Sequence, residues 1–179
     1  MKKDNSMYKM RVSFDLDEVL FVNPETHKTE PMLSFPFNKI FKERLRYGTP
    51  DLIRKLQEEG FEVWVYTSSF RSETYIKCLF WLYKIRFDDI INGPRHLKEV
   101  QGNRKETYPQ KMPCKYRISL HIDDETVICT AGKAYGFNVY QLDAHDDDWK
   151  EKILDRVHKI RKLERPDLLE GEEDAGLAE

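Results

Sequence analysis

Long apolar runs are missing from this sequence, which nowhere approaches the ~20 consecutive apolar residues that a membrane-spanning helix requires. The opening residues, MKKDNSMYKM, carry charges with no apolar core after them, so we expect neither an export signal nor a membrane anchor. Cysteine is also scarce: Cys78, Cys114 and Cys129 are odd in number and lack CxxC spacing, which argues against a disulfide framework and a zinc site. We therefore expect a protein of the reducing cytoplasm.

A strong charge of either sign is absent as well. The 30 basic and 32 acidic residues leave a formal net charge of -2. The composition therefore gives no overall attraction to nucleic acid or to an anionic membrane, and any affinity for a polyanion must be local. Hydrophobic residues make up 40% and charged residues 35% of the 179, a balance typical of one globular domain with a strongly solvated surface.

Short runs of apolar and β-branched residues, typical of buried strands, alternate with amphipathic segments. The predicted strands are 10–14, 61–66, 90–91, 117–122 and 137–142, and the predicted helices are 49–60, 71–85, 127–136 and 146–162. Strands that alternate with helices form right-handed βαβ units. We therefore expect an α/β fold, a three-layer sandwich with a mostly parallel, five-stranded, Rossmann-like sheet.

The chain is expected to form one domain, 1–163, followed by an acidic tail, 164–179. The tail is poor in aromatic residues and cannot bury enough surface to offset its ordering entropy, so we expect it to be disordered. Two longer segments interrupt the domain, a small insert at 22–47 and an irregular crossover or flap at 93–115. Long loops of this kind often carry function.

Polar side chains recur where the predicted strands end: Asp15 and Asp17 after the first, Thr67 after the second, Asp123 and Asp124 after the fourth. Ligands bind parallel α/β sheets at this edge. Asp15 and Asp17 project to the same side if the first strand stays extended. Converging carboxylates repel one another unless a hard cation lies between them, and oxygen ligands suit Mg²⁺. The sequence therefore predicts a magnesium site.

The segments VSFDLDEVL, VWVYTSS and SLHIDDE resemble motifs one, two and four of haloacid dehalogenase (HAD) superfamily phosphatases, in the same order. Motif one is DxDx followed by Thr or Val, which Asp15, Asp17 and Val19 match; the second aspartate distinguishes phosphatases and phosphotransferases from dehalogenases. The resemblance implies a HAD-like fold and Mg²⁺-dependent hydrolysis of phosphate monoesters. In that mechanism Asp15 becomes an aspartyl phosphate and Asp17 acts as general acid and base.

The resemblance also implies a set of metal ligands. Mg²⁺ would be held by the Asp15 carboxylate, the Asp17 backbone carbonyl and the motif-four pair. Of that pair, we favour Asp124 over Asp123 as the direct ligand, with the other aspartate outside the first coordination sphere.

The phosphate-binding role falls on the turn after the second strand. Thr67 would hydrogen-bond the phosphoryl oxygens, assisted by the backbone amides of Ser68 and Ser69 if the next helix presents its N-terminus there. Arg71 would add charge at the rim of the site.

The motif-three lysine is harder to place, because the crossover has no clear helix to locate it. The candidates are Lys98, Lys105, Lys111 and Lys115. We prefer Lys111, since QKMP lies closest before the strand that delivers the motif-four pair, and we assign Lys105 to substrate binding as the runner-up.

Other interpretations remain open. A signalling receiver domain also gathers aspartates, a hydroxyl and a lysine at strand ends, but it has the adjacent acidic pair first, whereas here that pair comes last. A binding module with this fold and no catalysis is hard to reconcile with an intact Asp15 and Asp17. His121 has no second histidine or cysteine at ligand spacing, so we expect a buried structural histidine.

Access to the site follows from the lengths of the connections. About thirty residues separate Asp17 from the helix at 49, and about two dozen separate the strands at 90–91 and 117–122, too few for a large cap domain. In this superfamily, members that lack large caps tend to act on bulkier molecules, so the resemblance favours a macromolecular substrate such as nucleic acid or protein. The proline-rich insert at 22–47 could instead fold over the site as a small lid.

Overall fold

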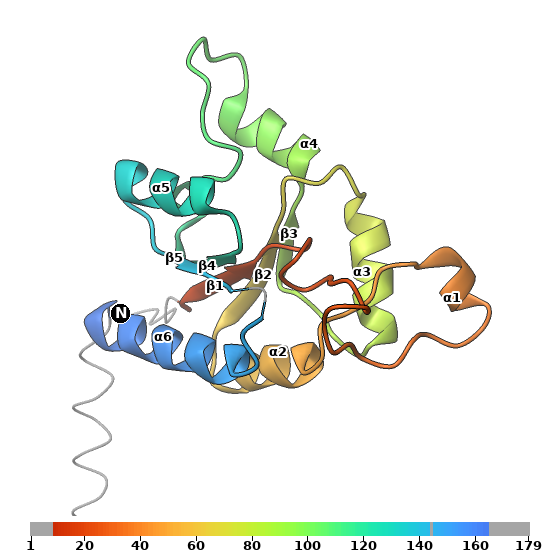
Figure 1. The fold of residues 1–179 in the computed structure, drawn as a ribbon. Helices are drawn as coiled ribbons and strands as arrows, with labels where there is room; N and C mark the ends of the chain where they lie inside the picture. Colours follow the sequence, from red (N-terminus) through yellow and green to blue (C-terminus); the bar gives the residue numbers. More distant parts are fainter. Residues whose placement is uncertain (1–8, 144, 165–179) are drawn as a thin grey trace, which may run out of the picture.

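The computed structural model describes residues 9–143 and 145–164, and its centre is a five-stranded parallel sheet with the order β3-β2-β1-β4-β5 (Figure 1). The predicted α/β class and parallel five-stranded sheet are confirmed. The strands are β1 (Arg11–Phe14), β2 (Glu62–Tyr66), β3 (Asp89–Ile91), β4 (Ile118–Asp123) and β5 (Val139–Gln141).

Helices cover both faces of the sheet. On one face, α2 (Thr49–Glu58), α3 (Glu73–Leu82) and α6 (Trp149–Glu164) share the main hydrophobic core with the sheet. On the other face lie α4 (Gly93–His96), its π-helical continuation η1 (Leu97–Gln101), and α5 (Thr126–Tyr135). Two shorter segments are α1 (Phe37–Ile40), within the insert, and the 3₁₀ turn η2 (Pro113–Tyr116), which leads into β4.

Local sequence signals explain where several helices begin and end. Pro50 lies in the first turn of α2, where its missing N–H costs no helical hydrogen bond. Ser72 caps α3 by accepting a 3.1 Å hydrogen bond from the backbone N–H of Tyr75. Gly136 ends α5 in the left-handed conformation, at φ 71°. The helix predicted from residue 71 therefore begins at Glu73, because Ser72 is its cap.

From β1 the chain first adds β2 and β3 on one side and then crosses over to add β4 and β5 on the other, so β1 and β4 are neighbours in the sheet. In parallel α/β sheets this arrangement opens a crevice at the carboxyl ends of the two strands, where ligands bind. The pairing continues one residue beyond β1, because the backbone N–H of Asp15 donates to the carbonyl of Ile122 at 3.0 Å. Asp15 is thus fixed beside Asp123, the last residue of β4.

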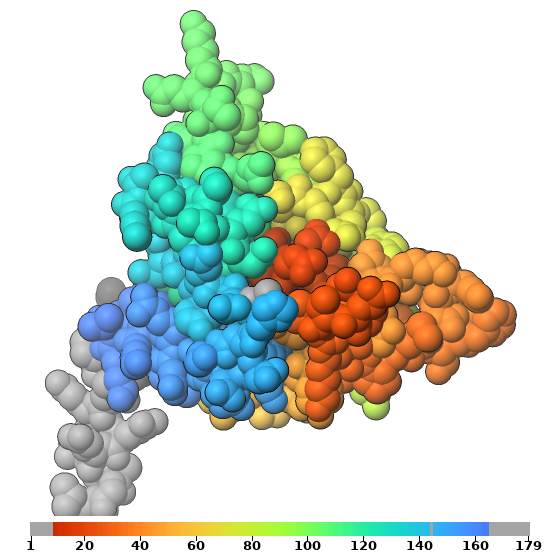
Figure 2. Space-filling model, in the orientation of Figure 1, coloured from red at the N-terminus to blue at the C-terminus, as the bar shows by residue number. Residues whose placement is uncertain are grey.

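The insert and the crossover both project from the body of the molecule, in orange and green respectively (Figure 2). The insert is anchored at its end by the buried Arg46, which donates 2.8 Å hydrogen bonds to the carbonyls of Val19 and Glu18. Helical turns occupy 93–101 of the crossover expected to be irregular, because Asn92 caps α4 by accepting from the backbone N–H of Arg95.

Two expectations concern the ends of the chain and membranes. The tail predicted to be disordered, 164–179, lies outside the described residues except for Glu164, which ends α6. Within the described part of the chain, no helix combines the length and the apolar character needed to cross a bilayer.

Candidate active site

Three charged side chains meet in the interior where β1 and β4 end. Lys111, from the loop before η2, places its Nζ 3.0 Å from Asp15 Oδ1 and 2.6 Å from Asp123 Oδ2. All three side chains are buried, with exposed fractions of 1% for Lys111, 8% for Asp15 and 0% for Asp123. Burial of this kind is rare for charged residues unless they are paired. Of the candidate lysines, the structure thus brings Lys111 to both carboxylates.

The ionisation of this triplet follows from burial and mutual charge. Burial raises the pKa of Asp15, against the opposing charge of Lys111 and with the help of the Asp123 charge. Burial also acts to lower the pKa of Lys111, but the charges of Asp15 and Asp123 outweigh it and leave that pKa above its ordinary value. Although burial opposes it, contacts with His121 and Lys111 lower the pKa of Asp123 to about 2. The site therefore holds a lysine cation and an ionised Asp123.

Both carboxylate oxygens of Asp123 accept hydrogen bonds within the protein. Besides Lys111, its Oδ2 accepts from His121 Nε2 at 2.8 Å, and its Oδ1 accepts from the backbone N–H of Glu125 at 3.0 Å. The other ring nitrogen of His121 lies 2.8 Å from Ser13 Oγ, also in the interior. His121 is buried as expected, and it orients Asp123. No pattern in the sequence points to this chain of contacts, because it depends on the pairing of Ser13 with His121 across β1 and β4.

The carboxylate of Asp124 is less buried than that of Asp123. It is half-buried, and burial together with the neighbouring charges of Asp123 and Glu125 raises its pKa. Asp15, Asp123 and Asp124 each offer one oxygen, all within 4.8 Å of one another. The buried Asp15 Oδ1 has the Lys111 ammonium at 3.0 Å and no other hydrogen-bond donor among the described residues. An under-satisfied buried oxygen among converging carboxylates fits a hard divalent cation.

Asp17 points away from this cluster toward the surface. Its side chain is 53% exposed and forms a bidentate ion pair with Arg71, in which Nη1 donates to Oδ2 at 2.8 Å and Nη2 donates to Oδ1 at 2.9 Å. The expected convergence of the Asp15 and Asp17 carboxylates is therefore wrong, because β1 ends at Phe14 and the chain turns at the fully buried Leu16 instead of staying extended. The Asp17 carboxylate is therefore outside the group of possible metal ligands, which leaves its backbone carbonyl for the role implied by the resemblance.

The turn after β2 is built from Thr67, Ser68 and Ser69. Thr67 is buried, and its hydroxyl oxygen accepts a 3.1 Å hydrogen bond from the backbone N–H of Ser69. That amide is therefore occupied within the turn, and α3 begins only at Glu73. The helix N-terminus expected at this turn therefore lies further along the chain, at Glu73, and phosphate binding by the Ser68 and Ser69 amides stays a prediction.

Gly93 supports this turn from the opposite side. Its backbone N–H donates to the carbonyl of Ser69 at 2.9 Å, and a Cβ atom at this position would lie 2.5 Å from the carbonyl oxygen of Ser68. Only glycine allows so close an approach of two backbones.

A buried hydrogen-bonding pair fixes the loop that carries Lys111. The hydroxyl of Tyr66 accepts from the backbone N–H of Met112 at 2.8 Å and lies 2.5 Å from His96 Nδ1. Burial lowers the pKa of His96, and its ring also bonds the backbone of Pro109, so the neutral imidazole accepts a hydrogen bond from the Tyr66 hydroxyl at Nδ1. Tyr66 and His96 thus hold the residue next to Lys111.

The other residues singled out in the crossover lie on the surface. Lys98, Lys105 and Lys115 are exposed, and no contact joins them to the buried carboxylates. Among the described residues, the structure therefore does not bring Lys105 into the site, because residues 102–110 form an exposed loop beyond η1.

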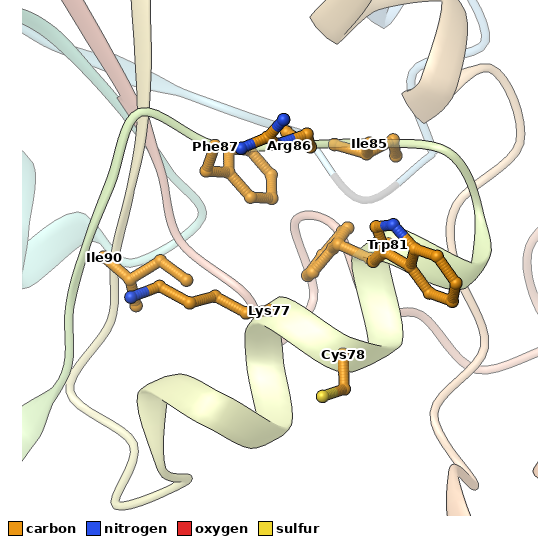
Figure 3. Close-up of a pocket in the computed structure, with 8 residues that line it drawn as sticks. Lys77, Cys78, Trp81, Ile85, Arg86, Phe87 and Ile90 are labelled. Carbon is orange, nitrogen blue, oxygen red and sulfur yellow. The ribbon is translucent and has the colours of Figure 1, made fainter.

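A separate cavity of about 340 Å³ lies between the outer side of α3 and the chain leading into β3 (Figure 3). It is lined mainly by apolar groups such as Trp81, Phe87 and Ile90, with the cations Lys77 and Arg86 at its edge. None of the aspartates described above borders it. The candidate site at the strand ends is thus separate from this apolar cavity.

No protein-family model matches the sequence, and no curated protein matches it either. The structure is similar to a predicted HAD-like family hydrolase from Porphyromonas gingivalis, with a TM-score of 0.50 and 15% identity over 83% of this chain and 97% of that one. It is also similar to a HAD-superfamily hydrolase, subfamily IA, variant 1, from Geobacter sulfurreducens, with a TM-score of 0.51 and 15% identity over 83% of this chain and 99% of that one. The chain therefore has the HAD-like fold that its motifs led us to expect.

Proposed function

We propose that this protein is a Mg²⁺-dependent phosphatase that hydrolyses phosphate monoesters through a phosphorylated Asp15. The observation that carries the proposal is the buried cluster in which Asp15 lies beside Lys111 and shares a cation-sized space with Asp123 and Asp124. Perturbed carboxylates around a buried lysine at the switch point of a parallel sheet are typical of a catalytic site.

In the first step a carboxylate oxygen of Asp15 attacks phosphorus, the bond to the ester oxygen breaks, and that oxygen takes a proton from Asp17. In the second step Asp17 accepts a proton from water, which attacks the phosphorus of the acyl phosphate and releases inorganic phosphate and free Asp15. Lys111 lies 3.0 Å from Asp15 Oδ1, where its charge orients the nucleophile and offsets negative charge on the phosphoryl group. The Thr67 hydroxyl would donate to a phosphoryl oxygen.

The donor set fits Mg²⁺, which when bound would neutralise the carboxylates and the substrate phosphate. Asp15 and Asp124 would hold it through carboxylate oxygens. Asp123 is the weaker candidate for a direct ligand, because Lys111, His121 and a backbone amide already occupy its oxygens.

Metal dependence and the nucleophile can be tested together. We expect phosphate release to stop with EDTA and to return with Mg²⁺, and Asp15→Asn to abolish turnover while the far-ultraviolet circular dichroism stays that of the wild type. Repeated Mg²⁺-dependent release of inorganic phosphate also separates a phosphatase from a receiver domain, which keeps its phosphate. Near-normal turnover of Asp15→Asn would falsify the mechanism.

The substrate is proposed to be an extended phosphorylated molecule, such as nucleic acid or protein. The insert and the crossover contain only short helical segments, four residues in α1 and four and five in α4 and η1, and Asp17 is half-exposed. These features support an open site. Comparing a phosphorylated oligonucleotide and a phosphopeptide with a compact sugar phosphate tests this, and strong preference for the sugar phosphate would contradict it.

A further inference from the structure

Arg71 forms ion pairs with two carboxylates, those of Asp17 and Glu43, at the edge of the candidate site. Its two terminal nitrogens bind both oxygens of Asp17, at 2.8 and 2.9 Å, while its Nε lies 3.0 Å from Glu43 Oε1. The planar guanidinium presents this two-pronged geometry to carboxylates and phosphates alike. Asp17 is the residue proposed to protonate the leaving oxygen, so the arginine lies against the catalytic acid.

The guanidinium is the fixed partner in this pair, and Asp17 is the freer one. Glu43 is held in turn by the hydroxyl of Tyr75, which donates to Oε2 at 2.6 Å, and the Arg71 carbonyl accepts from the Asn92 side chain at 2.9 Å. The side chains of Glu43 and Arg71 are 17% and 29% exposed, whereas that of Asp17 is 53% exposed. The insert, through Glu43, therefore aims the two terminal nitrogens of Arg71 at the space beside Asp17.

While both of its oxygens are bound to Arg71, Asp17 cannot face a leaving oxygen. An anion that takes its place on the guanidinium would release it. The transferred phosphoryl group must lie over Asp15, within reach of Thr67 and Lys111, whereas the acid acts on the opposite side of phosphorus, where the leaving group lies. An anion able to displace Asp17 therefore belongs to the leaving group.

We infer that Arg71 is a specificity-determining residue that binds a second anionic group, carboxylate or phosphate, on the leaving group of the substrate. The inference rests on the proposed phosphatase function. Binding of that second anion frees Asp17 to protonate the ester oxygen, so the substrate itself opens the pair. Glu43 and Tyr75 are positioning residues that act through Arg71.

The test uses substrates that differ in one group. 2-Phosphoglycerate and glycerol 2-phosphate differ only by a carboxylate in place of a hydroxymethyl group, and glycerol 1,2-bisphosphate supplies the anion as phosphate. Each is measured as a substrate and as a competitive inhibitor of p-nitrophenyl phosphate hydrolysis. We expect the wild-type protein to favour one or both anionic compounds over glycerol 2-phosphate by roughly tenfold or more, as a charge-assisted two-pronged contact gives. Whichever of the two anionic compounds is preferred shows whether the second anion is a carboxylate or a phosphate.

The variants are compared by the ratio of kcat/KM for an anionic compound to kcat/KM for glycerol 2-phosphate, rather than by their absolute rates. Arg71→Gln should bring the ratio close to one, and Arg71→Lys, which keeps the charge but not the two-pronged geometry, should leave it intermediate. Glu43→Gln should lower the ratio in the wild type but not further in Arg71→Gln, which a merely structural role would not produce. Arg54→Gln, at an exposed arginine of α2, is the matched control and should leave the ratio unchanged.

The outcomes separate this inference from the function it rests on. A wild-type ratio near one, or an equal loss for all three compounds in Arg71→Gln, would overturn the inference and place Arg71 on the transferred phosphoryl group or in a structural role. Absence of phosphate release from p-nitrophenyl phosphate as well would instead contradict the phosphatase function.

Discussion

Replacement of Lys111 by methionine removes the buried cation and keeps an unbranched side chain of similar length. Its Nζ lies within 3.0 Å of Asp15 and 2.6 Å of Asp123, and its side chain is 1% exposed. Breaking a buried ion pair from one side costs about 3–5 kcal/mol, because the remaining charge is left without compensation. At about 2–4 °C per kcal/mol for a chain of this size, the melting temperature should fall by on the order of 10 °C.

The Lys111→Met change should also lower kcat by more than the loss of folded protein can explain. Loss of one preorganised charge at the reacting group typically lowers kcat about a hundredfold or more. Thermal melting in EDTA gives the stability, and phosphate release below the melting temperature of the variant gives the rate. Lys105→Ala, at an exposed position in the same crossover, is the control and should leave both values near those of the wild type.

A Lys111→Met variant that melts within about 1 °C of the wild type and keeps its turnover would contradict this role of Lys111, because the loss of a buried, paired charge should lower both values by more. A crippled Lys105→Ala beside an active Lys111→Met would mean that the wrong lysine was assigned. A double-mutant cycle with Asp123→Asn adds a further check, since two residues in direct contact should give clearly non-additive losses.

Three other changes follow from the same geometry. Gly93→Ala should destabilise the protein by about 1–3 kcal/mol in denaturant unfolding, because its Cβ would lie 2.5 Å from the Ser68 carbonyl oxygen; stability equal to the wild type would show that the turn yields freely. Asp124→Asn should raise the Mg²⁺ concentration for half-maximal activity by at least the ~10–100-fold typical of outer-shell changes, whereas an unchanged Mg²⁺ titration would exclude it as a ligand. Ionised Asp123, with its pKa lowered from 3.8 to about 2, stabilises the fold above pH 3.8 and loses this contribution as the pH falls toward 2. In EDTA, the stability difference between the wild type and Asp123→Asn should therefore shrink across that window, and a constant difference would contradict the assignment.

The fold could be predicted from local patterns because the sheet and its helices have strong ones. The strand before Asp15 alternates Val12 and Phe14, which face the main core, with Ser13 on the other face. Likewise, the helices expected at 49–60 and 127–136 are α2 and α5 of the structure, with Pro50 in the first turn of α2 and Gly136 at the end of α5. The polar residues at strand ends were informative for a physical reason: parallel strands deliver their carboxyl ends to one edge, which is where the structure brings Asp15, Asp123 and Asp124 together.

What could not be predicted depends on contacts between distant parts of the chain. The approach of His121 to Ser13 requires the register of β1 against β4, and the pairing of Glu43 with Arg71 joins the insert to the start of α3. The choice of Lys111 had only its position in the sequence to support it, because loop 102–112 carries no periodicity. The local hydrogen bond from the Ser69 amide to the Thr67 hydroxyl was likewise not foreseen, because threonine side chains can bond nearby backbone groups in several alternative ways.

The most direct test of the central claim is to look for the phosphorylated aspartate itself. The protein is mixed with p-nitrophenyl phosphate and Mg²⁺, quenched in acid within the first turnovers, and mapped by peptide mass spectrometry. We expect one added phosphoryl group on Asp15, absent in EDTA and absent in Asp15→Asn. Turnover that proceeds without phosphorylation of Asp15, or a phosphoryl group found instead on another residue, would contradict it.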